Sequence, residues 1–180
     1  MLLAIDQGNQ RTKCALFDGG ALRETWSAPT VKDADAGQLA ALLPEDRAGL
    51  HIGLCTVVPV LLPIWTQLAA MVALPLTVIT GNSPTPLRNT YATLDTLGPD
   101  RLMAAVAAAH LVGTPVLPIS LGTATVVDAV TADGVYLGGM IAPGIAIGID
   151  GLARATSALP PASFTVPDSA IGHSSVESVE

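Results

Sequence analysis

Hydrophobic residues occur along the chain in short runs that end at glycine or asparagine, which is typical of strands closed by tight turns. The first run, residues 2–5, ends at Asp6-Gln7-Gly8-Asn9, and the chain returns through residues 13–17 to a second turn at Asp18-Gly19. Residues 21–27, in which Leu22 and Trp26 are apolar, can form a third strand. This pattern predicts an antiparallel meander of three strands at the start of the chain.

The segments after the meander alternate between helical and strand patterns. They predict helices over 33–43 and 60–73 and strands over 51–56 and 76–80. Residues 85–99 are polar and irregular, so we expect a loop there, followed by an alanine-rich helix over 101–112. The resulting order of three strands, helix, strand, helix and strand suits a mixed sheet covered by helices.

The opening pattern then returns in the second half of the chain. It predicts strands over 116–119, 125–130 and 135–141, a turn at Ser120-Leu121-Gly122-Thr123, and a helix over 145–158. Residues 3–8 and 117–122 match in pattern, which indicates an internal duplication rather than a short repeat. We therefore expect an α/β fold of two lobes with mixed sheets, divided into residues 1–98 and 99–180. The second copy has fewer predicted elements than the first, so we expect its lobe to be C-terminally incomplete, either because the chain is a fragment or because this member has lost part of that lobe.

Composition and charge argue against a nucleic-acid-binding or membrane-spanning protein. Half of the 180 residues are hydrophobic but only 3% are aromatic, so the core must be aliphatic. A net charge of -7 argues against a direct nucleic-acid partner. No apolar run reaches the roughly 18 residues of a membrane span, so we expect a soluble, cytoplasmic protein with no membrane partner. Cys14 and Cys55 lack the spacing of a metal site, and we expect them to be reduced thiols in the core.

The two glycine-centred loops, residues 6–10 and 120–124, carry the first candidate chemistry. A tight hairpin with glycine at its bend brings backbone N–H groups against phosphate oxygens. Asp6 at the end of a strand could hold a hydrated Mg²⁺, and Lys13 could add a positive charge. Two such hairpins across a cleft would grip a triphosphate from both sides, as phosphoryl transfer requires.

A second candidate lies between the loops, in Gly98-Pro99-Asp100-Arg101. A carboxylate that accepts a hydroxyl proton beside a guanidinium that grips an anionic substrate forms a coherent kinase pair. Asp100 could instead be the N-cap of the helix that follows, because aspartate is a favoured N-cap residue. The sequence leaves both interpretations of Asp100 open.

Three motifs together resemble those of type III pantothenate kinases. Residues 6–9 resemble the D-x-G-N-[TS] motif, residues 98–101 the G-x-D-R motif, and residues 122–125 the D-x-G-T-A-x-T motif. The segment Ile171-Gly172-His173-Ser174-Ser175 is similar to I-G-x-N-T. The resemblance implies two ribonuclease-H-like lobes of the actin-like ATPase superfamily around an ATP cleft. It also implies homodimers that use Mg²⁺ and a monovalent cation, K⁺ or NH₄⁺.

The resemblance further assigns roles to individual residues. The residues implied to contact ATP are Asp6, Gln7, Gly8, Asn9, Gln10, Arg11, Thr12, Lys13 and Thr123. Those implied to bind pantothenate are Tyr91, Gly98, Pro99, Asp100, Arg101 and Ser175. Asp100 is the implied proton acceptor for the pantothenate hydroxyl, and Asp6 would bind Mg²⁺ through water. Ser120 stands where the family has the aspartate that ligates the monovalent cation.

Two substitutions in these motifs leave more than one functional hypothesis open. Gln10 replaces the hydroxyl residue of the first motif, and Ser120 replaces the acid of the third. A neutral hydroxyl is a much weaker cation ligand than a carboxylate. The first hypothesis is ATP-dependent phosphorylation of pantothenate to 4′-phosphopantothenate, the first step of coenzyme A biosynthesis. The alternatives are a catalytically weakened regulatory relative, of the accessory transcription factor type, that binds nucleotide without efficient turnover, and another sugar-type kinase on the same fold.

Overall fold

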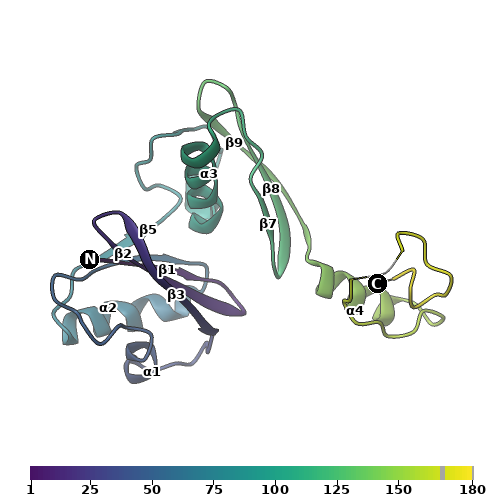
Figure 1. The fold of residues 1–180 in the computed structure, drawn as a ribbon, viewed down its shortest axis with the longest axis horizontal. Helices are drawn as coiled ribbons and strands as arrows, with labels where there is room; N and C mark the ends of the chain where they lie inside the picture. Colours follow the sequence, from purple (N-terminus) through teal and green to yellow (C-terminus); the bar gives the residue numbers. More distant parts are fainter. Residues whose placement is uncertain (167–168, 180) are drawn as a thin grey trace.

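The first lobe is a five-stranded mixed sheet with its helices packed on one face (Figure 1). A computed structural model describes residues 1–166 and 169–179 of the chain. The elements of this lobe are β1 (Leu2–Gln7), β2 (Arg11–Asp18), β3 (Ala21–Pro29), α1 (Ala36–Ala40), β4 (His51–Thr56), α2 (Leu62–Met71) and β5 (Leu76–Ile79). The strand order is β3-β2-β1-β4-β5, with β1 antiparallel to β2 and parallel to β4. The predicted meander and the order of elements after it are confirmed.

Alternation along β1 decides which side chains face the helices. Leu3, Ile5 and Gln7 are buried, whereas Asp6 between them is only partly buried. Because side chains alternate between the two faces of a strand, Asp6 and Gln7 lie on opposite sides of the sheet. The helix-facing side forms an aliphatic core around Trp65, which is fully buried.

Helix α1 is shorter than the predicted helix over 33–43. A capping box starts it, because Asp35 accepts from the Gln38 backbone and the Gln38 side chain accepts from the Asp35 backbone. The chain leaves the helix after Ala40, and Pro44 disfavours helical geometry in the residue before it. The remaining predicted positions are turns, a bend and irregular backbone.

The second lobe contains a four-stranded sheet in the order β6-β9-β8-β7. Its elements are β6 (Arg88–Asn89), α3 (Pro99–Val112), β7 (Ile119–Leu121), β8 (Ala124–Val130), β9 (Val135–Pro143) and α4 (Ile145–Ala155). The short β6 lies within the segment predicted to be a loop, and it pairs in parallel with β9. Leu87, Tyr91 and Leu97 pack in the core of this lobe. Residues 87–97 therefore pack with the second lobe, although the sequence placed the division after residue 98.

The second glycine hairpin is one residue shorter than the first. The amide of Gly122 donates to the Ala124 carbonyl two residues on, at 3.0 Å, whereas the amide of Gly8 donates to the Arg11 carbonyl three residues on, at 3.0 Å. Ser120 lies inside β7 rather than in the turn, so the predicted turn at 120–123 begins too early. The strand predicted over 116–119 is likewise displaced, with Val116 forming only an isolated bridge to Val130.

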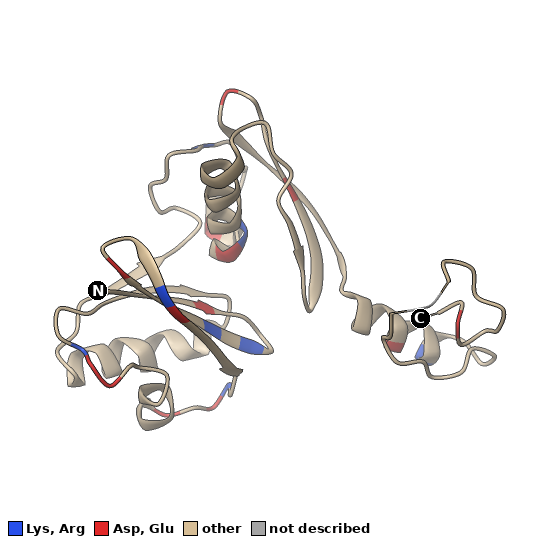
Figure 2. Cartoon of the chain, in the orientation of Figure 1, with Lys and Arg blue, Asp and Glu red and all other residues tan. Residues whose placement is uncertain are grey.

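Helix α4 ends at Ala155 rather than at the predicted residue 158, and the described residues after it contain no helix or strand. Lys and Arg lie scattered over both lobes (Figure 2). In the described parts of the chain, residues 1–166 and 169–179, no helix combines the length and the apolarity needed to cross a membrane.

Candidate active site

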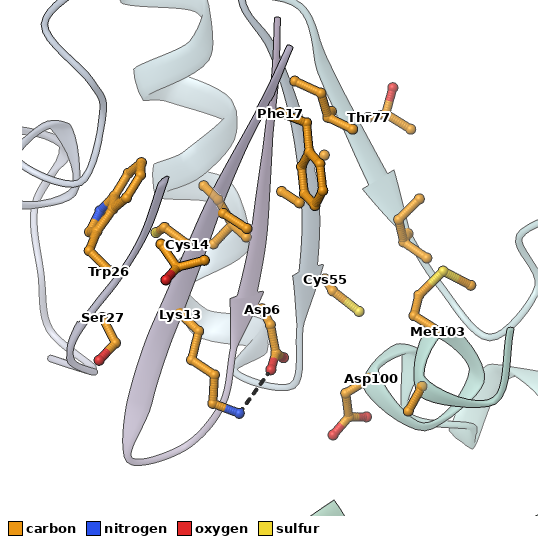
Figure 3. A pocket seen from close by; sticks show the side chains of 18 of the residues that line it. Asp6, Lys13, Cys14, Phe17, Trp26, Ser27, Cys55, Thr77, Asp100 and Met103 are labelled. Atoms are coloured by element: carbon orange, nitrogen blue, oxygen red, sulfur yellow. Dashed lines mark hydrogen bonds and ion pairs between the residues drawn. The ribbon is translucent and has the colours of Figure 1, made fainter. Parts of the chain in front are cut away.

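A cavity of about 1280 Å³ lies between the open face of the first sheet and α3. Its polar lining includes Asp6 and Lys13 from the first hairpin and Asp100 from α3. Figure 3 shows these three side chains gathered at one end of the cavity, away from Phe17 and Thr77. Two predicted site regions that are far apart in sequence therefore meet in one cavity.

Asp6 and Lys13 reach this cavity because they are cross-strand partners in the β1–β2 hairpin. Lys13 Nζ lies 3.3 Å from Asp6 Oδ2, and the two side chains keep 68% and 44% of their surface exposed. Such an exposed ion pair contributes little to stability. Both charges therefore remain accessible to a ligand.

Asp100 occupies the second position of α3 and is not its N-cap. Gly98 is the N-cap residue, no side chain caps it, and Pro99 begins the helix. The capping interpretation of Asp100 is therefore wrong. Asp100 Oδ1 is buried and has no hydrogen-bond partner within the described residues.

Burial raises the pKa of the Asp100 carboxyl above its ordinary value, and the negative charge of Asp6 adds to the rise. The backbone N–H groups of Arg101 and of Asp100 itself oppose this rise. An unpartnered carboxylate oxygen with a raised pKa is a suitable proton acceptor. A side chain at Gly98 would reach this oxygen, because an added Cβ would lie 2.5 Å from Asp100 Oδ1.

Arg101 does not point into the cavity as the kinase-pair interpretation expected. Its side chain is only 9% exposed, and Nη2 and Nε donate to Asp128 at 2.6 Å and 3.3 Å. Its guanidinium also lies 5.5 Å from the centre of the Tyr91 ring. The structure therefore shows an arginine already paired inside the second lobe.

The first hairpin divides into exposed and buried positions. Gly8 is half-buried, whereas Asn9, Gln10 and Arg11 are exposed at its tip. Gln7 and Thr12 are buried at 1% and 2% exposure, on the side of the sheet opposite Asp6. Their side chains therefore cannot contact a ligand in the cavity, and the structure does not support the predicted ATP contacts by Gln7 and Thr12 side chains.

The remaining predicted residues lie apart from the cavity. Ser120 and Thr123 are exposed on the second hairpin and are not among the residues that line the cavity. Ser175 lines a separate depression against α4, together with His173 and Leu152. The described structure thus joins the first hairpin to Asp100, but it does not bring the second hairpin or Ser175 to them.

Sequence reasoning did not identify Asp128 and Tyr136 as partners of the site. Asp128 is 2% exposed in β8, and the Tyr136 hydroxyl donates to its Oδ1 at 3.0 Å. A signal was present, because Asp128 is a charged residue within the otherwise apolar strand pattern of residues 125–130. A buried charge requires a paired partner, and Arg101 is that partner.

Both cysteine thiols are expected to be unreactive in the native protein. Burial raises the pKa of Cys14 to about 11. Burial, together with the charges of Asp6 and Asp100, raises the pKa of Cys55 to about 12. Because the thiolate is the nucleophile, N-ethylmaleimide at pH 7 should modify neither thiol until urea unfolds the chain. Mass spectrometry would check this, and rapid modification of native Cys55 would contradict the burial of this thiol.

The fold and the cavity together define a class of protein. A duplicated meander, a glycine hairpin beside a carboxylate, and helices packed on mixed sheets are the features of a two-lobed, ribonuclease-H-like α/β protein of the actin-like ATPase type. A crystal structure of a conserved Campylobacter jejuni protein, assigned to the Baf family of transcriptional activators, supports this fold. It matches with a TM-score of 0.62 at 16% identity, over 98% of this chain and 71% of that chain.

Comparison of sequences gives the family. A family model described as type III pantothenate kinase matches residues 2–180. The type III pantothenate kinase of Frankia alni is 36% identical over 189 residues, which cover all of this chain and 74% of the relative. The corresponding protein of Anaeromyxobacter sp. (strain K) is 35% identical over 190 residues, with the same coverage of 100% and 74%. The chain belongs to the type III pantothenate kinase family.

Proposed function

We propose that this chain transfers the γ-phosphoryl group of ATP to the hydroxyl group of pantothenate, the first step of coenzyme A biosynthesis. The observation that carries the proposal is the meeting of Asp100 with Asp6 and Lys13 in one cavity. Family membership supports the same reaction, because the matching relatives are named type III pantothenate kinases. The site offers a proton acceptor and charges for a phosphate, which phosphoryl transfer needs.

The chemical step follows from these positions. The pantothenate hydroxyl oxygen attacks the γ-phosphorus, and the bond to the oxygen that bridges the β and γ phosphates breaks. ADP leaves with that electron pair, and Asp100 accepts the hydroxyl proton. The buried, unpartnered Asp100 Oδ1 supports this role.

The residues of the first hairpin fit a magnesium-bound triphosphate. Asp6 is a half-exposed carboxylate at the end of β1, which suits a hydrated Mg²⁺, an ion that keeps several waters. When bound, Mg²⁺ would neutralise phosphate charge. The Gly8 N–H already donates to the Arg11 carbonyl, whereas the Asn9 N–H lies at the exposed tip of the hairpin, where it could donate to a phosphate oxygen.

The residues around Ser120 do not fit a monovalent-cation site. The Ser120 hydroxyl is neutral and exposed, and Asp128 of the neighbouring strand is already bonded to Arg101 and Tyr136. The proposal therefore contains no step that uses K⁺ or NH₄⁺. We expect the rate to be the same in K⁺ and Na⁺ buffers.

Three further parts of the proposal rest on the family resemblance. They are the homodimer, the cytoplasmic location, and pantothenate contacts by Tyr91, Ser175 and residues 98–100. Arg101 is not among these contacts, because it is bonded to Asp128 inside the second lobe. Light scattering on the purified chain tests the first, since a dimer would have twice the 18.2 kDa mass of the chain. Thr123 would join the ATP site only if the second hairpin approaches the first when nucleotide binds.

The central experiment measures formation of 4′-phosphopantothenate by mass spectrometry with purified protein, ATP, Mg²⁺ and pantothenate. Omission of Mg²⁺ and replacement of pantothenate by glucose are the controls. Product that depends on both Mg²⁺ and pantothenate supports the proposal. ATP binding without product would reject it in favour of the regulatory alternative, and phosphorylation of glucose would favour a sugar-type kinase.

Lys13→Met should weaken ATP binding without affecting folding. The side chain is 68% exposed, so the free energy of unfolding should change by less than about 0.5 kcal/mol. Loss of one phosphate contact should raise the KM for ATP about tenfold. Arg23→Met is the matched control, because Arg23 forms a similar exposed pair with Asp18 at 2.9 Å outside the cavity. Equal KM values for the two variants would argue against a phosphate contact by Lys13.

A further inference from the structure

Four side chains of the second lobe form a cluster that we call the arginine clamp: Arg101, Asp128, Tyr136 and Tyr91. Asp128 accepts from Arg101 at 2.6 Å and 3.3 Å and from the Tyr136 hydroxyl at 3.0 Å. The Tyr91 ring covers the guanidinium at 5.5 Å and packs at a tilt against the Tyr136 ring. The clamp joins α3, β8 and β9 with the 90–97 segment.

Stability alone does not explain the clamp. The free-energy cost of removing two opposite charges from water offsets most of their attraction. Apolar side chains of similar volume therefore often stabilise a core equally well. What a buried, bidentate pair supplies is a fixed geometry. Burial, and then the hydrogen bond to Asp128, raise the pKa of Tyr136 above its ordinary value. Burial lowers the pKa of Arg101, but its hydrogen bonds and the nearby charge of Asp128 raise it overall, so both groups remain protonated.

Two glycines of β9 make room for the clamp. A Cβ at Gly139 would overlap the Val127 carbonyl and would lie 2.8 Å from Asp128 Oδ1. Gly138 has a φ of +89°, and a Cβ there would lie 2.8 Å from Tyr91 Cδ2. The Gly138-Gly139 pair therefore admits both the carboxylate and the ring that hold Arg101.

The clamp holds the residue next to Asp100, because Arg101 belongs to the same helical turn. Arg101 directly follows Asp100 in the first turn of α3, where no side chain caps the helix. Below this turn, Leu102 and Ala105 are fully buried in the core of the second lobe. The core holds the chain on both sides of this turn, at Leu97 and at Leu102, and the clamp holds the residue next to Asp100 within it.

We propose that Asp128 is a positioning residue for phosphoryl transfer: by holding Arg101, it fixes the first turn of α3 and so places the Asp100 carboxylate in the cavity. The inference rests on the proposed function, in which Asp100 accepts the proton. Asp128 itself does not line the cavity and acts only through Arg101. Tyr136 supports it by holding the Asp128 carboxylate.

The test compares Asp128→Asn with Asp133→Asn. Asp133 forms an ion pair of 2.8 Å with Arg88 in the same lobe, but both side chains are largely exposed, at 69% and 68%. Displacing a reacting group by about 1 Å lowers a rate by about 100-fold, so we expect kcat to fall by about that factor in Asp128→Asn. The KM for ATP should not change, because the first hairpin is untouched, and Asp133→Asn should keep its kcat.

A purely structural role would give a different result. Asp128→Asn would then melt at a lower temperature but keep its kcat per folded molecule, which would overturn the proposal. If this variant does not fold, Tyr136→Phe decides, because it keeps both charges and removes only the hydroxyl. A lower kcat with an unchanged KM for ATP supports the proposal, and an unchanged kcat overturns it.

Amide hydrogen exchange separates this inference from the proposed function. If the wild-type chain forms no 4′-phosphopantothenate, the proposed function fails by itself. The amides of Arg101 and Leu102, which both bond to the Gly98 carbonyl, still report the first turn of α3. Faster exchange there in Asp128→Asn than in Asp133→Asn supports the positioning role, and equal exchange overturns it.

Discussion

Asp100→Asn is expected to lower kcat for pantothenate phosphorylation by about a thousandfold, because it removes the group that accepts the hydroxyl proton. The amide has nearly the same shape as the carboxylate, so the cavity and the clamp should remain. The KM for ATP should change little, since Asp6 and Lys13 are untouched. Steady-state kinetics with both substrates would measure each effect. A variant that retains at least about a tenth of wild-type kcat would contradict proton transfer to Asp100.

The same substitution is expected to stabilise the protein at neutral pH. The folded-state pKa of Asp100 is raised, mainly by burial, so folding disfavours the charged form of this carboxyl. A raised acid pKa contributes stability below the unfolded pKa, and that contribution is lost as the pH rises through the folded pKa. Near pH 7 the buried charge therefore opposes folding, and asparagine carries no such charge.

Thermal unfolding between pH 3 and pH 8 would test whether Asp100→Asn stabilises the protein at neutral pH. The melting temperature of Asp100→Asn should exceed that of the wild type at pH 7, and the difference should shrink as the pH falls. Asp150→Asn is the control, because Asp150 is 67% exposed on α4 and its pair with Arg154 spans 3.9 Å. A lower melting temperature for Asp100→Asn at pH 7 would mean that the carboxylate is stabilised by its surroundings. Higher stability with lost turnover would mark Asp100 as a functional residue that folding does not require.

The meander of β1, β2 and β3 could be predicted from the sequence because its signals are local. Glycine turns separate short apolar runs, and pairing between neighbouring runs needs no distant partner. The same locality explains Asp6 and Lys13, which face each other across one hairpin. The two-residue β6 carries no pattern of its own, and it forms only because β9 offers a parallel edge.

The rest of the site depends on tertiary packing. Asp100 lines the cavity only because α3 lies against the open face of the first sheet, and no local sequence pattern predicts this packing. Arg101 finds its partner in Asp128, which is distant in sequence, so its paired state could not be foreseen. Gln7 is different, since Leu3 and Ile5 are apolar and period-two alternation already predicts the same face for residue 7. The motif resemblance assigned Gln7 to ATP although its register places it in the core.

Gln7→Leu is expected to destabilise the first lobe strongly, although leucine is apolar and similar in size. Gln7 Oε1 accepts from Thr56 Oγ1 at 2.9 Å and from Trp65 Nε1 at 3.2 Å. Gln7 Nε2 also donates to Thr12 Oγ1 at 3.4 Å. Leucine would leave the buried Trp65 Nε1 without an acceptor, which costs about 1–3 kcal/mol. It would also leave the half-buried Thr56 hydroxyl with only the longer bond to the Val58 carbonyl, at 3.5 Å. We expect the free energy of unfolding to fall by about 3 kcal/mol, which corresponds to a decrease in melting temperature of roughly 10 °C.

The substitution should also affect the first hairpin, which we propose binds the triphosphate. Thr12 Oγ1 lies 3.0 Å from Thr30 Oγ1, which donates to the Gly8 carbonyl at 2.8 Å. Gln7 thus anchors, through two hydroxyl groups, the hairpin that would hold the triphosphate. The KM for ATP should rise in Gln7→Leu even in conditions where the variant is fully folded, because the hairpin loses that support.

Urea unfolding followed by tryptophan fluorescence, together with ATP kinetics, would measure both effects. Gln67→Leu is the matched control, since it makes the same substitution at an exposed position of α2. The control should change the free energy of unfolding by less than about 0.5 kcal/mol. If Gln7→Leu unfolds like the control but loses ATP binding, Gln7 contacts the nucleotide directly and the buried network is not its role. If the stability falls and the KM for ATP rises, Gln7 is instead a core residue that stabilises the first hairpin from the side opposite the cavity. The alternation of side chains along β1 places Gln7 on that side.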